Sequence, residues 1–131
     1  MKASSSFDRM LACVAAALDR KAYDLVVLDT AALTSVADYF VICSGRSDTQ
    51  VQAIADAIAH DGAERGLRPL AIEGREQGRW ALLDYGDVVV HVFYTPVREF
   101  YHLERLWVRA PRVELPEPYQ SQARRQKTGT D

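Results

Sequence analysis

The chain has 131 residues and a mass of 14.7 kDa, which suits one domain, and its apolar (48%) and charged (26%) fractions are those of ordinary globular proteins. Sixteen Lys and Arg against eighteen Asp and Glu give a formal net charge of −2, so the chain as a whole lacks the strong positive charge typical of dedicated nucleic-acid binders. Two cysteines are too few for a disulfide scaffold or a zinc site, and no apolar run approaches the ~20 residues that span a membrane, so we expect reduced, buried thiols in a cytoplasmic protein.

The first predicted element is an amphipathic helix near the N-terminus. Apolar residues recur there at helical spacing: Phe7, Met10, Leu11, Val14 and Leu18. Ser5, followed three residues later by Asp8, is typical of a capping box at the start of a helix. Charged residues stand directly before and after the apolar stretch 10–18, which favours a docked helix over a secretory signal.

Two strands and a second helix follow. Residues 23–29 and 38–44 are short, β-branched apolar runs, and Gly45 ends the second. Ser47, with Gln50 three residues on, predicts the capped start of a helix that stops near Gly66. Residues 67–72 indicate a weaker strand at a sheet edge, because Pro69 lacks a backbone donor.

Residues 80–85 and 88–93 predict a β-hairpin around the turn Gly86-Asp87, where glycine tolerates positive φ. A two-residue turn sets the register, so Tyr85 opposes Val88 and Trp80 opposes Phe93. Alternation along the strands gives one small, apolar face for the core. The other face mixes aromatic, acidic and imidazole side chains: Trp80, Leu82, Asp84, Val89, His91 and Phe93.

The apolar pattern changes near the C-terminus. Residues 97–107 keep helix-like spacing, whereas three prolines and mostly polar residues follow position 109. We therefore expect one domain over 1–108 and a disordered tail over 109–131. The order of elements predicts an α/β fold in which helices flank a mixed β-sheet and the helix after the second strand forms a parallel crossover; two or three layers are both compatible.

Patterns for metal binding or covalent catalysis are weak. The three histidines, His60, His91 and His102, lie on different predicted elements, without the spacing that metal sites require. Cys43 lies within an apolar strand, which favours a packed thiol over a nucleophile. We expect no metal and no catalytic cysteine.

The link between the second strand and the second helix carries Gly45-Arg46-Ser47, a pattern that suits an anion at a helix N-terminus and that opens the nucleotidyltransferase motif. That reaction needs paired carboxylates to hold two divalent ions, and only Asp48 is near. We therefore expect no catalytic residue and no cofactor, with a nucleotidyltransferase-like nucleotide-binding enzyme as the alternative function.

The residues around the hairpin suggest protein docking instead. Trp, Tyr and Arg are enriched at binding hot spots. Four residues of these types lie within about twenty positions here: Trp80, Tyr85, Arg98 and Tyr101. A lone histidine such as His91 in an apolar strand is most often a hydrogen-bonded structural residue. A direct RNA-binding module remains a third class, but the basic residues are spread along the chain, with the cluster Arg124, Arg125 and Lys127 in the expected tail.

Three stretches together resemble the ribosomal silencing factors, the RsfS/Iojap family. They are DYFVICSG at 38–45, WALLDYGDVVVHVF at 80–93 and REFYHLERLW at 98–107. The resemblance implies a nucleotidyltransferase-like fold without the catalytic acids. It also implies a protein that binds large-subunit ribosomal protein fourteen on the intersubunit face, blocks subunit joining and represses translation under nutrient limitation or in stationary phase. A homodimer is a further implied partner, whereas a membrane or a specific nucleic-acid sequence is not.

The same resemblance implies a set of partner-binding residues at the motif positions: Trp80, Asp84, Tyr85, His91, Arg98, Tyr101 and Glu104. We expect Trp80, Tyr85 and Tyr101 to be aromatic anchors and Asp84 to accept hydrogen bonds from a basic partner residue. The alternative for His91 and Glu104 is that they brace the hairpin against the last helix.

Overall fold

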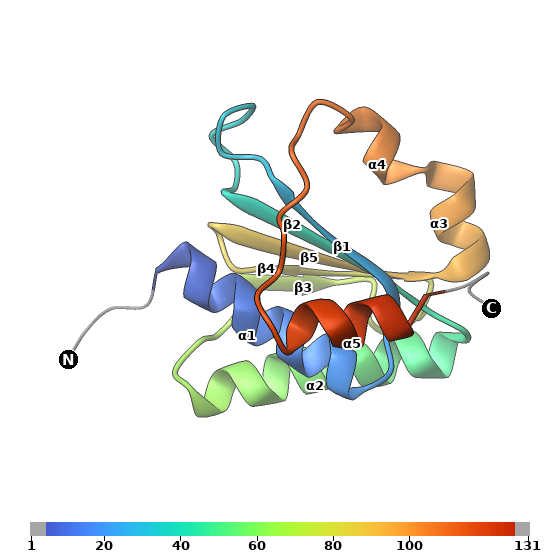
Figure 1. The fold of residues 1–131 in the computed structure, drawn as a ribbon. Coiled ribbons are helices and arrows are strands. Elements are labelled where there is room, and N and C mark those ends of the chain that lie inside the picture. Colours follow the sequence, from blue (N-terminus) through green and yellow to red (C-terminus); the bar gives the residue numbers. More distant parts are fainter. Residues whose placement is uncertain (1–4, 128–131) are drawn as a thin grey trace.

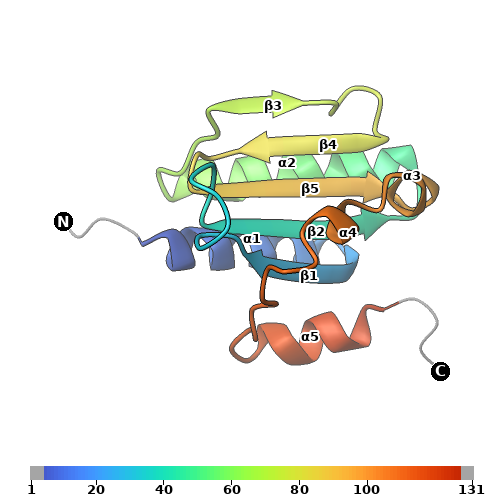
Figure 2. The same ribbon diagram turned by 90° about the horizontal axis from the view of Figure 1, so that it is seen from above.

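The computed structural model describes residues 5–127, which form a five-stranded mixed sheet with helices on both faces (Figure 1). The strands are β1 (Tyr23–Asp29), β2 (Tyr39–Gly45), β3 (Ala71–Glu73), β4 (Trp80–Asp84) and β5 (Val88–Tyr94). Their order across the sheet is β1-β2-β5-β4-β3, with β2 and β5 parallel and the other neighbours antiparallel (Figure 2). The predicted α/β class and mixed sheet are confirmed. No helix within the described residues is long and apolar enough to cross a membrane.

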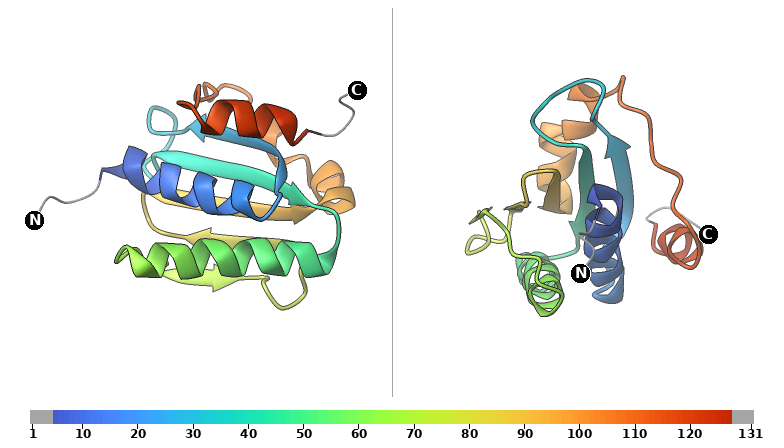
Figure 3. Two further views of the ribbon diagram at one scale, coloured as in Figure 1. Left: turned by 60° about the horizontal axis from the view of Figure 1, so that its bottom comes forward. Right: turned by 90° about the vertical axis from the view of Figure 1, so that its left-hand side faces the viewer.

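Two long helices, α1 (Ser6–Asp19) and α2 (Asp48–Glu64), cover one face of the sheet (Figure 3). Both begin as the sequence predicts: the Ser5 hydroxyl accepts from the Asp8 N–H at 3.1 Å, and the Ser47 hydroxyl accepts from the Gln50 N–H at 3.0 Å. Beneath them lies the larger core, whose biggest fully buried side chains include Met10, Leu18, Val41, Ile54, Ile58 and Leu83. Burial of these side chains fixes which face of each element points inward.

The opposite face carries two short helices, α3 (Thr95–Tyr101) and α4 (Leu103–Leu106), which makes a third, smaller layer (Figure 1). The single helix expected over 97–107 is broken at His102, whose φ of 51° is left-handed. The break lets Leu103 turn toward the sheet, where it joins a second core with Phe40, Ile42 and Phe93.

The hairpin has the predicted register. Trp80 pairs with Phe93 and Leu83 with Val90, and the Tyr85 N–H donates to the Val88 carbonyl at 2.9 Å. The strand expected at 67–72 is shorter and later, at β3, and it lies at the sheet edge as predicted.

Residues 109–127 correct the expectation of a disordered tail. This segment, which we call the strap, runs along the outer edge of β1: the Asp29 N–H donates to the Pro111 carbonyl and the Val113 N–H to the Val27 carbonyl, both at 2.8 Å. The strap then forms α5 (Tyr119–Arg125), which packs against α1 and β1 (Figure 3). Its buried apolar side chains, Leu115 and Ala123, join the larger core.

The physical reason for this correction is the position of the prolines. Pro111 precedes Val113, whose N–H pairs with β1, and Pro116 and Pro118 follow it, so the prolines do not interrupt that pairing. Burial of Leu115 between the prolines and of Ala123 in α5 opposes the entropy cost of ordering. Residues 128–131, which also belong to the expected tail, lie outside the described residues.

Candidate protein-docking surface

An apolar groove opens where the start of β4 and the end of β5 meet α3. Its volume is about 400 Å³ and its lining is mostly aromatic or aliphatic: Arg79, Trp80, Tyr94, Pro96, Val97, Phe100 and Tyr101. Phe100 is 81% exposed and Tyr101 is 55% exposed, which is unusual for side chains of this size. Exposed aromatic carbon beside a groove is typical of a surface that a protein partner covers.

Local structure explains why Trp80 lies in this groove. Trp80 is the first residue of β4 and pairs with Phe93, so both rings project toward the face that carries α3. The Trp80 ring contacts the rings of Phe93 and Tyr101, with centroids 4.7 and 5.1 Å apart. Phe100 then meets Tyr101 edge-on at 5.1 Å. The groove is therefore the outer end of a continuous aromatic cluster that is fixed to the sheet.

His91 lies beneath this cluster. The indole N–H of Trp80 donates to Nδ1 of His91 at 3.1 Å, and the His91 ring also makes a T-shaped contact with the Phe40 ring. Burial lowers the pKa of His91 to about 4, so its ring is neutral near pH 7 and Nδ1 is free to accept. The side chain is only 5% exposed. This placement agrees with the alternative in which His91 braces the hairpin.

Arg98 and Glu104 form an ion pair that joins α3 to α4, with 2.7 Å between Arg98 Nη2 and Glu104 Oε2. Arg98 Nη1 also donates to the Asp24 carbonyl and to the Ser44 hydroxyl, each at 2.8 Å. Burial raises the pKa of Glu104, but the hydrogen bond and the charge of Arg98 outweigh burial and bring this pKa below its usual value. Both side chains are mostly buried, so the pair holds the two helices to β1 and β2.

The remaining two predicted residues lie elsewhere. Asp84 is half-buried, and its Oδ1 accepts from the Gly86 N–H at 2.8 Å, which stabilises the hairpin turn. Tyr85 points to the opposite face of the sheet and is buried in the larger core beneath α1 and α2. Burial raises the pKa of its hydroxyl. The structure thus separates Tyr85 from Trp80.

Of the seven residues that the sequence indicated, only Trp80 and Tyr101 line the groove. Sequence reasoning missed Phe100, which is the most exposed aromatic residue of the groove. The helix-like spacing of residues 97–107 assigned Phe100 to a packed face, whereas the break at His102 leaves it exposed. Arg79, from the glycine-punctuated loop before β4, was missed as well.

Two other places carry polar side chains that could hold a ligand. At the N-terminus of α2, the Asp48 carboxylate accepts from the Thr49 N–H at 2.7 Å. Strand β5, which is the parallel neighbour of β2, carries no carboxylate that could form a metal-binding pair with Asp48. At the other end of α2, side-chain atoms of His60, Asp61 and Glu64 lie within 4.8 Å of one another, but the group is largely exposed to solvent. The two places are at opposite ends of one helix, so they do not form a shared site.

Comparisons with known proteins give one consistent result. Residues 3–131 match the family model described as "Ribosomal silencing factor during starvation". The chain is 48% identical over 101 residues to ribosomal silencing factor RsfS of Bacillus subtilis. The aligned region covers 77% of this chain and 86% of that protein. It is 39% identical over 108 residues to the chloroplastic protein Iojap of Arabidopsis thaliana, covering 82% of this chain and 45% of that protein.

Solved structures agree with the sequence comparisons. A crystal structure of a protein from Chromobacterium violaceum matches with a TM-score of 0.78 at 36% identity, covering 79% of this chain and 87% of that one. A crystal structure from Bacillus halodurans matches with a TM-score of 0.73 at 44% identity, covering 81% of this chain and 96% of that one.

Proposed function

Because the chain belongs to the family of ribosomal silencing factors, we propose that it represses translation by binding the large ribosomal subunit and keeping the small subunit from joining. The partner is large-subunit ribosomal protein fourteen on the intersubunit face, and repression sets in under nutrient limitation or in stationary phase. In this proposal the protein acts as a steric block and catalyses no reaction.

The observation that carries this proposal is the apolar groove beside α3. A groove of about 400 Å³ can take one or two apolar side chains of a partner, and Phe100 and Tyr101 add exposed aromatic surface next to it. The exposed Arg79 at the rim offers a charged hydrogen-bond donor. Hot spots have this composition, with buried aromatic anchors and a polar edge.

The groove is also held rigid before a partner arrives. Trp80 is fixed by its hydrogen bond to His91 and by its packing on Phe93. Arg98 and Glu104 hold α3 and α4 in place. A preformed site loses little conformational entropy on binding, which favours a tight complex. His91, Arg98 and Glu104 therefore support the docking surface as positioning residues.

The test is co-sedimentation of the protein with purified large subunits. Phe100→Ala and Tyr101→Ala truncate exposed rings, so both variants should fold normally and bind about tenfold or more weakly. Val36→Ala is the matched control, because Val36 is a similarly exposed apolar residue in the loop between β1 and β2. Loss of binding in all three variants, or in none, contradicts the placement of the contact.

A second measurement addresses the mechanism. Large subunits preloaded with wild-type protein should form fewer complete ribosomes when small subunits are added, and isolated ribosomal protein fourteen should compete for the silencing factor. Unchanged assembly at saturating protein overturns the steric block even if binding is observed.

A further inference from the structure

The strap changes how charge is distributed over the molecule. Residues 1–108 carry eleven Lys and Arg against fifteen Asp and Glu, whereas residues 109–131 carry five against three. In the sequence these cations belong to an expected tail, but in the structure four of them, Arg112, Arg124, Arg125 and Lys127, lie on one surface with other cations. We call the combined surface the basic face; its members are Lys21, Arg46, Arg112, Arg124, Arg125 and Lys127.

Specific hydrogen bonds bring these segments together. Gln126 Nε2 donates to the Ala22 carbonyl at 2.6 Å, which ties the end of α5 to the loop after α1. Gln50 Nε2 donates to the Lys21 carbonyl at 3.1 Å, which ties the start of α2 to the same loop. The Arg46 guanidinium lies 4.4 Å from the centre of the Tyr23 ring. The loop after α1, the start of α2 and the end of α5 therefore place their cations near the start of β1, whereas Arg112 lies farther along that strand, opposite Leu28.

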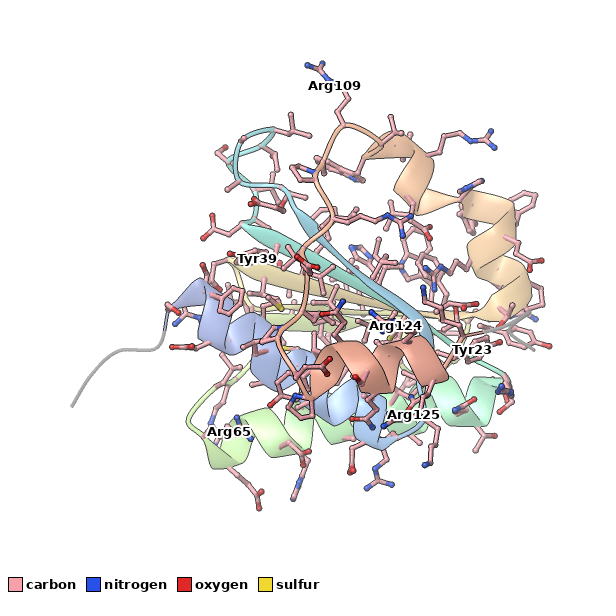
Figure 4. The ribbon with its side chains drawn as sticks, viewed as in Figure 1. Tyr23, Tyr39, Arg65, Arg109, Arg124 and Arg125 are labelled. Atoms are coloured by element: carbon pink, nitrogen blue, oxygen red, sulfur yellow. The ribbon has the colours of Figure 1, made fainter. Side chains whose placement is uncertain are left out.

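The view with side chains shows the same arrangement. Figure 4 shows Arg124 and Arg125 on α5 on the same side as Tyr23, whereas Arg65 and Arg109 lie at other margins of the molecule. The basic face is thus a local feature, although arginines occur elsewhere on the surface.

The basic face also contains a depression. Two neighbouring hollows, of about 380 and 190 Å³, share Leu25, Val26, Arg112 and Lys127 in their lining. Arg124 lines the smaller one. Acidic residues line the hollows too: Asp24, Glu99 and Glu104 the larger, and Glu114 the smaller. The Glu104 charge is compensated by its ion pair with Arg98.

The cations of the basic face are available to a ligand. Each is exposed, and within residues 5–127 none forms an ion pair with a carboxylate. In contrast, Arg9, Arg75 and Arg98 are each paired with an acid. Arginines with exposed guanidinium groups suit phosphate oxygens, because the planar group can donate two parallel hydrogen bonds.

We propose that the basic face binds the phosphate backbone of RNA without regard to sequence, as a second contact with the large ribosomal subunit. This inference rests on the proposed function, because a protein that docks on a ribosome meets ribosomal RNA beside any ribosomal protein. The groove lies on the β4 side of α3, whereas the basic face extends from the β1 side of α3 to α5. One rigid body thereby contacts protein and RNA at once, which raises the total affinity.

The test compares two triple variants of the full chain. The first is Arg124→Gln, Arg125→Gln and Lys127→Gln, which neutralises part of the basic face. The control is Arg65→Gln, Arg68→Gln and Arg109→Gln, which removes the same charge from exposed positions outside it. Affinity for purified large subunits and for an RNA duplex of arbitrary sequence is measured between about 50 and 300 mM salt. Removal of one phosphate-binding cation should make the slope of log K against log salt shallower by about 0.9.

We expect the first variant to have a slope shallower by about 2 to 3 with both probes and about tenfold weaker binding at low salt, and the control to match wild type. Equal effects of the two variants show a response to net charge only and overturn the proposal. Weaker subunit binding by the first variant, with no duplex binding by wild type, assigns the surface to an acidic protein and overturns it as well.

Melting temperatures of both variants verify that they fold. Phe100→Ala separates this inference from the proposed function: it should lose affinity for ribosomal protein fourteen while its binding to the RNA duplex stays at the wild-type level. If Phe100→Ala does not weaken binding to ribosomal protein fourteen, the duplex measurement still tests the RNA contact on its own.

Discussion

The indole N–H of Trp80 donates a hydrogen bond to Nδ1 of His91, so a residue of the groove is oriented by a residue of the interior. Nε2 of the same imidazole is buried without a partner among the described residues. Protonation of His91 would remove the acceptor and place a charge in an apolar layer, so the groove depends on a neutral ring.

This relationship predicts a pH dependence. The pKa of His91 is lowered to about 4 in the folded protein, against about 6.5 when unfolded. The unfolded state therefore binds more protons between these values, so the stabilisation is fully present above about pH 6.5 and is lost as pH falls toward 4. The loss amounts to about 3 kcal/mol. Urea denaturation across this range should show it, and His91→Leu should flatten it.

The control for that experiment is His60→Gln, since His60 is exposed on α2. This variant should keep the pH dependence of wild type. A wild-type free energy of unfolding that is constant from pH 6.5 to 4.5 would contradict the assigned role of His91.

Loss of the Arg98–Glu104 pair should loosen the helices beside the groove. Glu104→Gln leaves the Arg98 guanidinium without its anionic partner in a largely buried position, so we expect a loss of about 2 kcal/mol in unfolding free energy. Equilibrium unfolding in urea measures it. Arg75→Gln breaks an exposed pair with Asp56 and should matter much less. A larger effect for Arg75→Gln is incompatible with this account.

Removal of the strap should destabilise the domain. Deletion of residues 109–131 leaves the outer edge of β1 unpaired and takes Leu115 and Ala123 from the core. We expect a loss of about 3 kcal/mol or more, with increased self-association through the open edge. Thermal melting and light scattering report on the two effects. Leu115→Ala in the full chain isolates the packing contribution at about 2 kcal/mol.

An unchanged melting temperature after the deletion would instead support the disordered tail that the composition predicts. Increased scattering of the deletion variant, but not of Leu115→Ala, would assign the self-association to the exposed strand edge.

Truncation of Trp80 should weaken binding to the large subunit. Trp80→Ala removes the ring that forms the inner wall of the groove, so we expect a cost of about 2 kcal/mol or more in binding free energy. Because Trp80 also packs on Phe93, the variant needs a melting curve beside the binding assay. Full binding by a folded Trp80→Ala protein excludes Trp80 as an anchor.

Much of the fold follows from local sequence rules. The two-residue turn at Gly86-Asp87 determined the hairpin register, and Ser5 and Ser47 marked the starts of both long helices, because turns and caps are local interactions. The family followed from motif order. These are features that a few neighbouring residues determine.

The unpredicted features depend on interactions between distant segments. The strap could not be predicted because its pairing partner, β1, lies more than eighty residues away, and proline content alone suggests disorder. The break at His102 depends on the pocket that receives Leu103. Tyr85 is a different case: the motif positions grouped it with Trp80, although alternation, which is a local rule, sends their side chains to opposite faces.

The strap also has a consequence for how this protein is made. Leu28 meets Arg112, so β1 emerges from a translating ribosome long before the segment that completes its outer margin. During that interval the nascent chain presents an unsatisfied strand that other nascent chains could join. We expect synthesis to be the most aggregation-prone stage in the life of this molecule, and slow translation of the region after α4 to aggravate it.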